Sequence, residues 1–434
     1  MFETLKNALM TKEIRIKIFL TLLMLLVYRI GCYIPVPGID STAVASYFTS
    51  DDFLSILSTI TGGSLQNATL FSLGILPFIN AFIIMQLLTL VIPKLEKLSK
   101  EGDAGRRKIT QITRYFALVL AAIQGIGVVI GWKANINSVF PFETGWDAPY
   151  LTMACIIIIL MAGSTMVMWL GERITEYGVG NGTSLIIFIG ILSTAGTTMA
   201  TAFKMVGQQW TYIWNIIGFI LIVFAIFAFI VFMDLAERRV TVQYSKQIKG
   251  NKMYGGQTTY IPIRINGSGV MPIIFASSLL MFPQMIMALF ARESEAYLWY
   301  STHMGSGTWV YYVLLALFIL FFSYFYAQIQ FNPEDVSKNI QQYGGFIPGI
   351  RAGKPTSDFL KKISNRVTLF GAFFLMVIAL VPTFIFQALS DGGALPFNSA
   401  FSATGLLIVV SVALEFNKQL ESQIMMKHYK GFLK

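Results

Sequence analysis

A chain of 434 residues that is 55% hydrophobic and only 12% charged is not a soluble globular protein, in which about a quarter of residues are charged. Its mean hydropathy of +0.65 and its recurring long apolar runs indicate a polytopic membrane protein. The net charge of +10 alone leaves nucleic acid, anionic lipid and membrane topology open as explanations. The two cysteines have no neighbouring Cys or His, which excludes a disulfide framework and disfavours a metal site.

The first apolar run starts at Ile18 and ends in the Pro- and Gly-containing stretch 35–38, without a small-residue cleavage site, so it predicts a retained membrane span. Residues 62–72 are too small and polar to cross a bilayer, whereas the sequence from Leu73 is apolar and opens with Gly74 and Pro77. We therefore expect a short plug-like piece that leads into a second span at about 73–92.

Ile75 and Ile79 of that second span are spaced i,i+4, so a helix projects these two stiff β-branched side chains from one face. Asn80 and Gln86 add polar groups to the same span. A span with this composition suits the lining of a gated pore better than packing among lipids.

Eight further apolar runs bring the predicted number of spans to ten. The predicted external loops contain only Lys133, Lys204 and Arg292 of the 32 Lys and Arg residues, while nearly all the others fall in internal segments. The positive-inside rule therefore places both ends of the chain in the cytoplasm, and topology accounts for most of the positive charge. The eight runs are 113–131, 150–170, 183–203, 211–233, 268–290, 309–329, 367–389 and 399–416.

Two long internal loops, 237–267 and 330–366, have more structure than a connection requires. In the first, alternating residues around Val242 and Ile263 predict two strands that flank the basic stretch 246–252. In the second, Asn332 and Pro333 predict a helix start and Gly344–Gly345 its end, and a flexible loop follows that presents Arg351 and Lys354. We favour a docking surface over plain solvated loops, which remain the alternative.

The spans contain an apparent inverted repeat. The sequence GILP at 74–77 opens the second span on its inward path, and GVMP at 269–272 opens the seventh on its outward path. Spans one to five, within 1–205, and spans six to ten, within 206–434, would then be halves related by a pseudo-twofold axis in the membrane plane. The functional site would lie at their interface.

The ten spans have almost none of the chemistry that coupled transport or hydrolysis needs. Arg29 lies near the outer end of its span, where it can snorkel, and Asp234 and Glu415 fall near the cytoplasmic ends of theirs. No HExxH motif, deep carboxylate pair or P-loop is present, so we expect no catalysis and no cofactor. An intramembrane hydrolase is thus disfavoured, and an inverted-repeat transporter of a small solute remains the alternative to a passive conduit with an apolar barrier.

Several segments, distributed over essentially the whole chain, resemble the SecY family, the central subunit of the bacterial protein-translocation channel. The two most specific are TLFSLGILPFINAFIIMQLL at 69–88 and WLGERITEYGVGNGTSLII at 169–187, and further matches include YRIGCYIPVPGID at 28–40 and NGSGVMPIIFASS at 266–278. The resemblance implies an all-α polytopic protein whose ten transmembrane helices form a clamshell of two inverted five-helix halves around an hourglass pore.

The resemblance also implies a role for individual residues. The pore ring would be Ile75, Ile79, Ile187, Ile274 and Ile408. The plug would be about 61–72, with Gly62, Gly63, Ser64, Leu65, Gln66, Asn67 and Leu70. The lateral gate would open between spans two and three and spans seven and eight, and our candidates there are Asn80, Gln86, Ser277 and Phe282.

The partners implied by the resemblance are the small subunits SecE and SecG, the ATPase SecA, the ribosome with its nascent chain, signal-bearing polypeptides and membrane lipid. SecA or the ribosome would dock on Lys246, Lys249, Lys252, Arg351 and Lys354. The expected location is the bacterial plasma membrane, and no sequence-specific nucleic-acid binding is expected.

Overall fold

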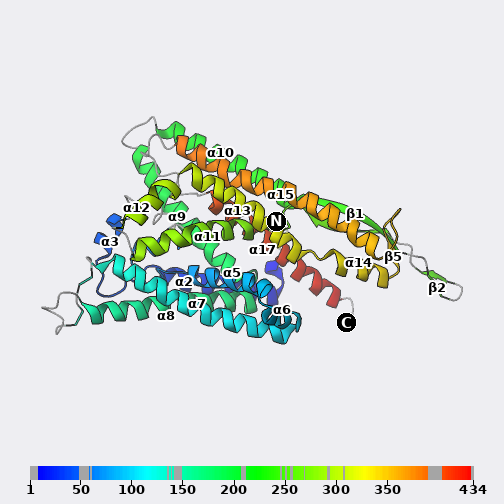
Figure 1. Ribbon diagram of the computed structural model, residues 1–434, viewed down its shortest axis with the longest axis horizontal. Helices are drawn as coiled ribbons and strands as arrows, with labels where there is room; N and C mark the ends of the chain where they lie inside the picture. Colours follow the sequence, from blue (N-terminus) through cyan, green and yellow to red (C-terminus); the bar gives the residue numbers. More distant parts are fainter. Residues whose placement is uncertain are drawn as a thin grey trace.

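The computed structural model is mostly helical over the residues that it describes, which are 8–47, 58, 61–133, 136–137, 139–140, 149–206, 212–244, 247–249, 252–254, 258–267, 269–290, 294–305, 308–389 and 403–431. A long helix lies over each of the apolar runs predicted from the sequence (Figure 1). These helices are α2 (Lys12–Gly31), α5 (Leu76–Val91), α7 (Asp103–Gly131), α8 (Tyr150–Tyr177), α9 (Gly182–Val206), α10 (Tyr212–Leu235), α11 (Met271–Phe290), α13 (Trp309–Gln330), α15 (Lys354–Leu389) and α17 (Ala403–Gly431).

Within the described residues, six of these helices are long and apolar enough to cross a bilayer, namely α7, α8, α9, α10, α13 and α15. A seventh candidate is α5 together with α6 (Pro93–Lys100), which meet at an angle of 98°. A span needs about 20 apolar residues. The chain is therefore a multi-pass membrane protein.

Several helices continue beyond their apolar runs into polar sequence. Helix α15 begins at Lys354, well before its apolar run, and α17 extends to Gly431. Lys, Arg and Glu are good helix formers, so the helix continues where the hydropathy falls. Hydropathy therefore marks where the lipid ends, not where the helix ends.

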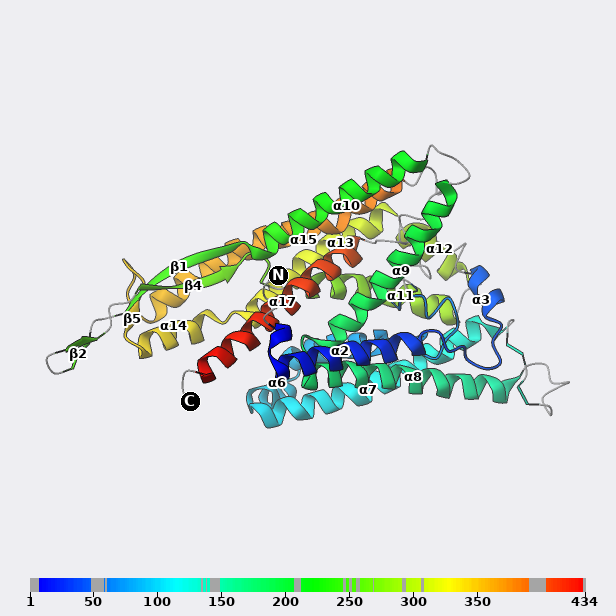
Figure 2. The ribbon, with the colours of Figure 1, turned by 180° about the vertical axis from the view of Figure 1, so that it is seen from behind.

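The helices form two groups that lie face to face (Figures 1 and 2). In the first group α2 and α7 pack against α8, and α5 packs against α7. In the second, α13 packs against α11 and α15, and α10 packs against α15 and α17. Contacts between α9 and α17 and between α7 and α11 join the groups.

A small sheet extends from one end of the bundle. Strands β1 (Glu237–Tyr244) and β4 (Thr258–Arg264) pair antiparallel, with Val240 opposite Ile261, which confirms the two strands predicted from the alternating pattern. Strand β5 (Gly345–Phe346) adds to β1 in the order β4-β1-β5. Between β1 and β4 in the chain, β2 (Gln247–Lys249) and β3 (Lys252–Tyr254) pair as a separate ribbon beyond this sheet.

Helix α14 (Pro333–Gln342) starts and stops where the sequence predicts. The Asn332 side chain accepts a hydrogen bond of 3.1 Å from the Glu334 amide, and Pro333 takes the first helical position. Gly344, with a φ of +67°, follows the end of the helix. The cap and turn signals of this loop therefore sufficed to define its helix.

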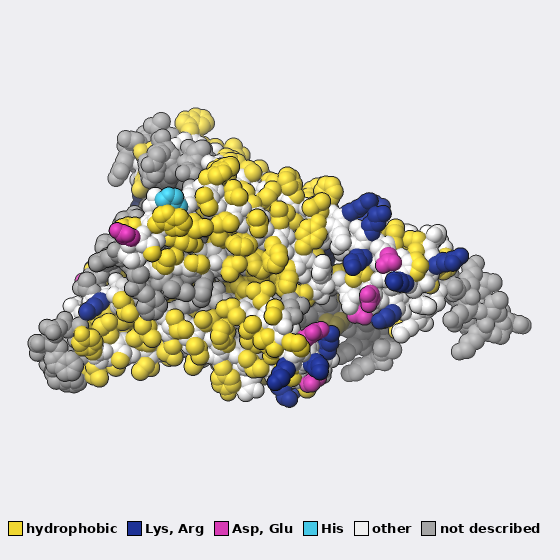
Figure 3. Space-filling view, viewed as in Figure 1, with side chains coloured by type: hydrophobic (Ala, Val, Ile, Leu, Met, Phe, Trp, Pro, Cys, Tyr) yellow, Lys and Arg dark blue, Asp and Glu magenta, His cyan; other side chains and the backbone are white. Residues whose placement is uncertain are grey.

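Charge is distributed unevenly along the long axis of the molecule. On the face shown in Figure 3, Lys and Arg side chains gather at the end that carries β1, α14 and α6, and hydrophobic side chains cover the middle. The opposite end carries α3 (Ser41–Tyr47) and α12 (Glu295–Met304). This distribution agrees with the uneven division of basic residues between the predicted loops.

Candidate functional site: an apolar constriction, its plug and its gate

The five isoleucines predicted to form a ring belong to a single cluster of packed side chains. Ile75, Ile187 and Ile408 are buried within it, with 3%, 6% and 7% of their surface exposed. Ile79 and Ile274 are partly buried and pack against it. The five come from α5 and the residue that precedes it, from α9, from α11 and from α17, so helices of both groups meet in this cluster.

The two predicted repeat motifs adopt the same local geometry. Gly74 and Gly269 have φ values of +54° and +62°, a left-handed conformation that favours glycine, and in each case the helix begins two residues later. Ile79 and Ile274 each lie five residues after their glycine. The two motifs therefore place isoleucines at the same offset from a left-handed glycine, on helices of the two groups, in the same cluster.

The predicted plug, residues 61–72, is a series of turns rather than a helix. Its polar groups bond to one another: the backbone N–H of Asn67 donates to Gly63 O at 3.1 Å, and the Thr69 hydroxyl donates to Ser64 O at 3.2 Å. The residues after α2 bond to the backbone of this segment: Val36 N donates to Ala68 O at 3.0 Å, and Leu70 N donates to Ile34 O at 2.9 Å. The segment is thus self-contained and attached by few backbone bonds.

Most predicted plug residues are buried or half-buried, and Asn67 is exposed. Leu70 packs against the isoleucine cluster, and Phe71, which the sequence did not single out, is 1% exposed within it. Leu65 instead joins a second cluster with Leu73 and Leu160. The predicted plug therefore contacts the isoleucine cluster through its last residues, and Phe71 could only be found from packing.

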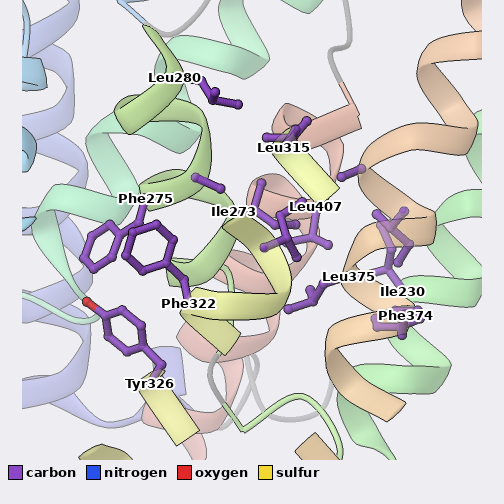
Figure 4. Close-up of a cluster of buried hydrophobic side chains, with 14 of the residues drawn as sticks. Ile230, Ile273, Phe275, Leu280, Leu315, Phe322, Tyr326, Phe374, Leu375 and Leu407 are labelled. Carbon is purple, nitrogen blue, oxygen red and sulfur yellow. The ribbon is translucent and has the colours of Figure 1, made fainter. Parts of the chain in front are cut away.

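The gate candidates fall on the helices that face one another across the two groups. Gln86 of α5 accepts a hydrogen bond of 2.6 Å from the Tyr326 hydroxyl of α13. Ile83 is buried in the large cluster of the second group, where Phe275, Phe322 and Tyr326 point toward one another (Figure 4). These contacts join α5 to the second group of helices.

The other gate candidates lie on α5 and α11. Asn80 is half-buried on α5, and the Ser277 hydroxyl donates to Ile274 O of its own helix at 3.0 Å. Phe282 lies on α11, but its side chain is outside the described residues. Sequence reasoning missed Tyr326, because nothing in the local pattern shows that it faces Gln86.

The basic loops lie at the charged end of the molecule. Arg351 is exposed, and its carbonyl accepts a hydrogen bond of 2.8 Å from the Thr356 hydroxyl, while Ser337 of α14 donates to Gly353 O at 2.7 Å. Lys354 is exposed at the start of α15. These bonds fix the backbone that presents both cations.

The tip of the sheet is described only in part. Lys246 lies outside the described residues. Lys249 and Lys252 are paired across β2 and β3, and their side chains are not among those described. The backbone of the predicted basic tip therefore forms a two-stranded antiparallel ribbon.

Within the described residues, no group of three or more His, Cys, Asp or Glu side chains could hold a metal ion. The arrangement consists instead of an apolar constriction, a turn-rich segment seated on it and an apolar boundary between two groups of helices. Together these features define a multi-pass membrane protein of the channel type.

The comparisons with known proteins agree on one family. The SecY family model matches residues 69–417. Two curated relatives named protein translocase subunit SecY, from Streptomyces griseus and Bacillus subtilis (strain 168), are each 40% identical to the chain, over 444 and 440 residues. Both alignments cover 100% of both sequences. The chain belongs to the SecY family.

Solved structures share the fold. One described as the structure of a protein conducting channel superposes with a TM-score of 0.66 at 20% identity, covering 94% of this chain and 91% of that chain. The Sec61 channel of a canine ribosome–channel complex gives 0.61 at 18% identity, with the same coverage. The resemblance noted in the sequence is thus confirmed.

Proposed function

We propose that this chain is the protein-conducting subunit of a translocase, a passive and plugged pore that passes unfolded signal-bearing polypeptides and releases membrane helices sideways into lipid. The observation that supports this most directly is the convergence of five isoleucines from four parts of the chain with Leu70 and Phe71 of the plug. A ring of stiff aliphatic side chains excludes water by dewetting and still deforms around a passing chain. The family match favours this function over transport of a small solute.

In this proposal ten helices cross the bacterial plasma membrane in two inverted halves, 1–205 and 206–434, around an hourglass pore, with both ends of the chain in the cytoplasm. The uneven distribution of Lys and Arg supports this orientation. The equivalent positions of Ile79 and Ile274 after left-handed glycines support the inverted halves.

The plug rests on the isoleucine ring from the external side in this proposal. The lateral gate is the boundary at which α5 and α7 meet α11 and α13. Its closed form is stabilised by the Gln86–Tyr326 hydrogen bond and by packing of Ile83. A signal helix would separate these contacts by offering its own apolar surface.

Energy for transport comes from partners, because the proposed pore catalyses nothing itself. The SecA ATPase or the ribosome would bind the basic ribbon around Lys249 and Lys252 together with Arg351 and Lys354. Two solved neighbours are ribosome-bound channel complexes, from canine endoplasmic reticulum and from yeast. SecE and SecG are the proposed small subunits beside the chain.

Protease protection of a signal-bearing unfolded polypeptide tests the proposal, with this chain reconstituted with SecE, SecG, SecA and ATP in sealed vesicles. We expect protected polypeptide only when both the chain and ATP are present. Vesicles that contain SecE, SecG and SecA without the chain are the control. Lack of protection despite verified insertion and SecA binding would refute the conduit and require a screen of small solutes.

A further inference from the structure

Arg29 is a cation near the outer end of α2, within the first predicted span. A charge in such a place is costly and usually has a specific partner. The side chain is half-buried rather than directed fully into solvent, and its guanidinium makes contacts inside the protein. The sequence-based expectation that it snorkels therefore does not describe it fully.

Two of the contacts of Arg29 join parts of the chain that are far apart in sequence. Its Nη1 donates to the carbonyl oxygen of Gly62, in the first turn of the plug, at 3.3 Å. Its Nη2 donates to the hydroxyl of Ser193 on α9 at 2.5 Å and lies 3.4 Å from the Tyr33 hydroxyl. One guanidinium thus connects α2, α9 and the plug.

The backbone at Gly62 fits closely against this arrangement. A Cβ atom at this position would lie 2.7 Å from Arg29 Nη1 and 2.9 Å from the Cα of Gly190 on α9. Gly62 also has a φ of +69°, a conformation that side chains disfavour. The plug can enter the space between α2 and α9 only because this residue has no side chain.

Helix α2 also holds the other end of the plug, by packing. Tyr28 stacks on Phe71, with ring centroids 5.9 Å apart and planes at 10°. Gly31 has no side chain where the Phe71 ring lies against it, and Cys32 is 2% exposed in the same cluster. The last turn of α2 therefore contacts both ends of the plug, one through hydrogen bonds and one through apolar packing.

We infer that Arg29 is the positioning residue that latches the plug in its closed place, by holding Gly62 against Ser193 of α9. This inference rests on the proposed function, since it takes residues 61–72 as the plug. The Phe71 end is held by non-directional packing, which tolerates sliding. The Arg29 end is held by directional, charge-assisted bonds, which fix the register of the plug. Displacement of the plug removes the Gly62 acceptor from the guanidinium.

The chain carries its own reporter for this latch. Cys32 is buried in the cluster that contains Phe71 of the plug, and the only other cysteine in the sequence is Cys155. In a Cys155→Ser background, the whole translocase is placed in sealed vesicles with its external face outward, and an impermeant maleimide added outside reports how often the plug leaves. We expect Arg29→Met to raise the rate of Cys32 labelling by about tenfold, the scale of losing one charge-assisted hydrogen bond.

Two further variants make the test specific. Ser193→Ala keeps the arginine but removes its acceptor on α9, so we expect a smaller rise in labelling. Lys204→Met removes a cation from the exposed external end of the same helix, and it should leave labelling unchanged. Parental labelling rates in both Arg29→Met and Ser193→Ala would overturn the latch.

A deletion of residues 65–70 shows whether a negative result refutes the latch alone or the plug as well. The deletion should expose Cys32 and raise resting ion conductance in planar bilayers. If the deleted channel conducts while Arg29→Met matches the parent in labelling and conductance, the latch is wrong and the plug stands. If the deleted channel does not conduct, the plug itself is wrong and the latch with it.

Discussion

Tyr326 on α13 and Gln86 on α5 are 240 residues apart in sequence, and the tyrosine hydroxyl donates a hydrogen bond of 2.6 Å to the Gln86 side-chain oxygen. Tyr326 is 7% exposed and packs in the large apolar cluster, so water does not readily replace the bond. A polar contact within an apolar boundary gives the proposed gate a defined closed position, and it separates when the two helices part.

Tyr326→Phe removes this hydroxyl while keeping the ring. A hydrogen bond of this kind contributes about 1 kcal/mol, so the gate should open about fivefold more readily. We expect transport of a polypeptide whose signal has a shortened apolar core to rise, measured by protease protection. Tyr343→Phe is the control, because Tyr343 is 76% exposed at the end of α14. Unchanged rejection of the weak signal would show that the bond does not hold the gate.

Ile187→Thr tests the apolar barrier. The exchange keeps the β-branched shape but places a hydroxyl in the constriction, which favours water there. We expect higher resting ion conductance in planar bilayers with normal folding. Ile158→Thr makes the same exchange on α8, where Ile158 is 64% exposed, and should conduct like the parent. Equal conductance of the two variants would contradict the ring.

Deletion of residues 65–70 tests the plug. The segment bonds mainly within itself and to the residues after α2, so the helices should still assemble without it. Some stability should be lost, because Leu65 is buried. We expect a folded channel with raised ion conductance, checked by detergent-solubilised yield and by bilayer recording. A tight channel from well-folded protein would refute the plug assignment.

Arg351→Glu tests the docking surface. The loop backbone is fixed by hydrogen bonds from Thr356 and Ser337, so reversing one exposed charge should not unfold it. We expect motor- or ribosome-driven transport to fall severalfold, with normal expression, because an acidic partner surface would be repelled. Lys94→Glu is the control, because it reverses an exposed charge elsewhere at the same end of the molecule. Normal transport by Arg351→Glu would refute the role of this loop.

The sequence was most informative where one residue type dictates the backbone. Gly74 and Gly269 precede helices with the same offset, and Asn332 with Pro333 begins α14, as predicted. The strands around Val242 and Ile263 follow from alternation alone. These features depend on neighbours along the chain, so local chemistry is enough to find them.

The remaining features depend on packing between distant segments. Phe71 is one of many phenylalanines, and only the fold shows that it lies against Tyr28 and beside the isoleucine cluster. The Tyr326–Gln86 bond and the bonds of Arg29 to Gly62 and Ser193 likewise join residues that are 33 to 240 positions apart. The spacing of Ile75 and Ile79 indicated a shared helix face, whereas Ile187, Ile274 and Ile408 were predicted only because the resemblance named them, since single isoleucines in a membrane helix are otherwise indistinguishable.

Helix α5 carries both Ile79 of the proposed pore ring and Gln86 of the proposed gate, only two turns apart on one helix. In the proposed channel the pore and the gate therefore cannot move independently, and the free energies of occupying each are coupled. The coupling is reciprocal: if binding of a signal helix weakens the binding of the plug, loss of the plug strengthens the binding of signal helices by the same free energy. A channel of this design recognises its cargo and breaks its own seal in a single equilibrium.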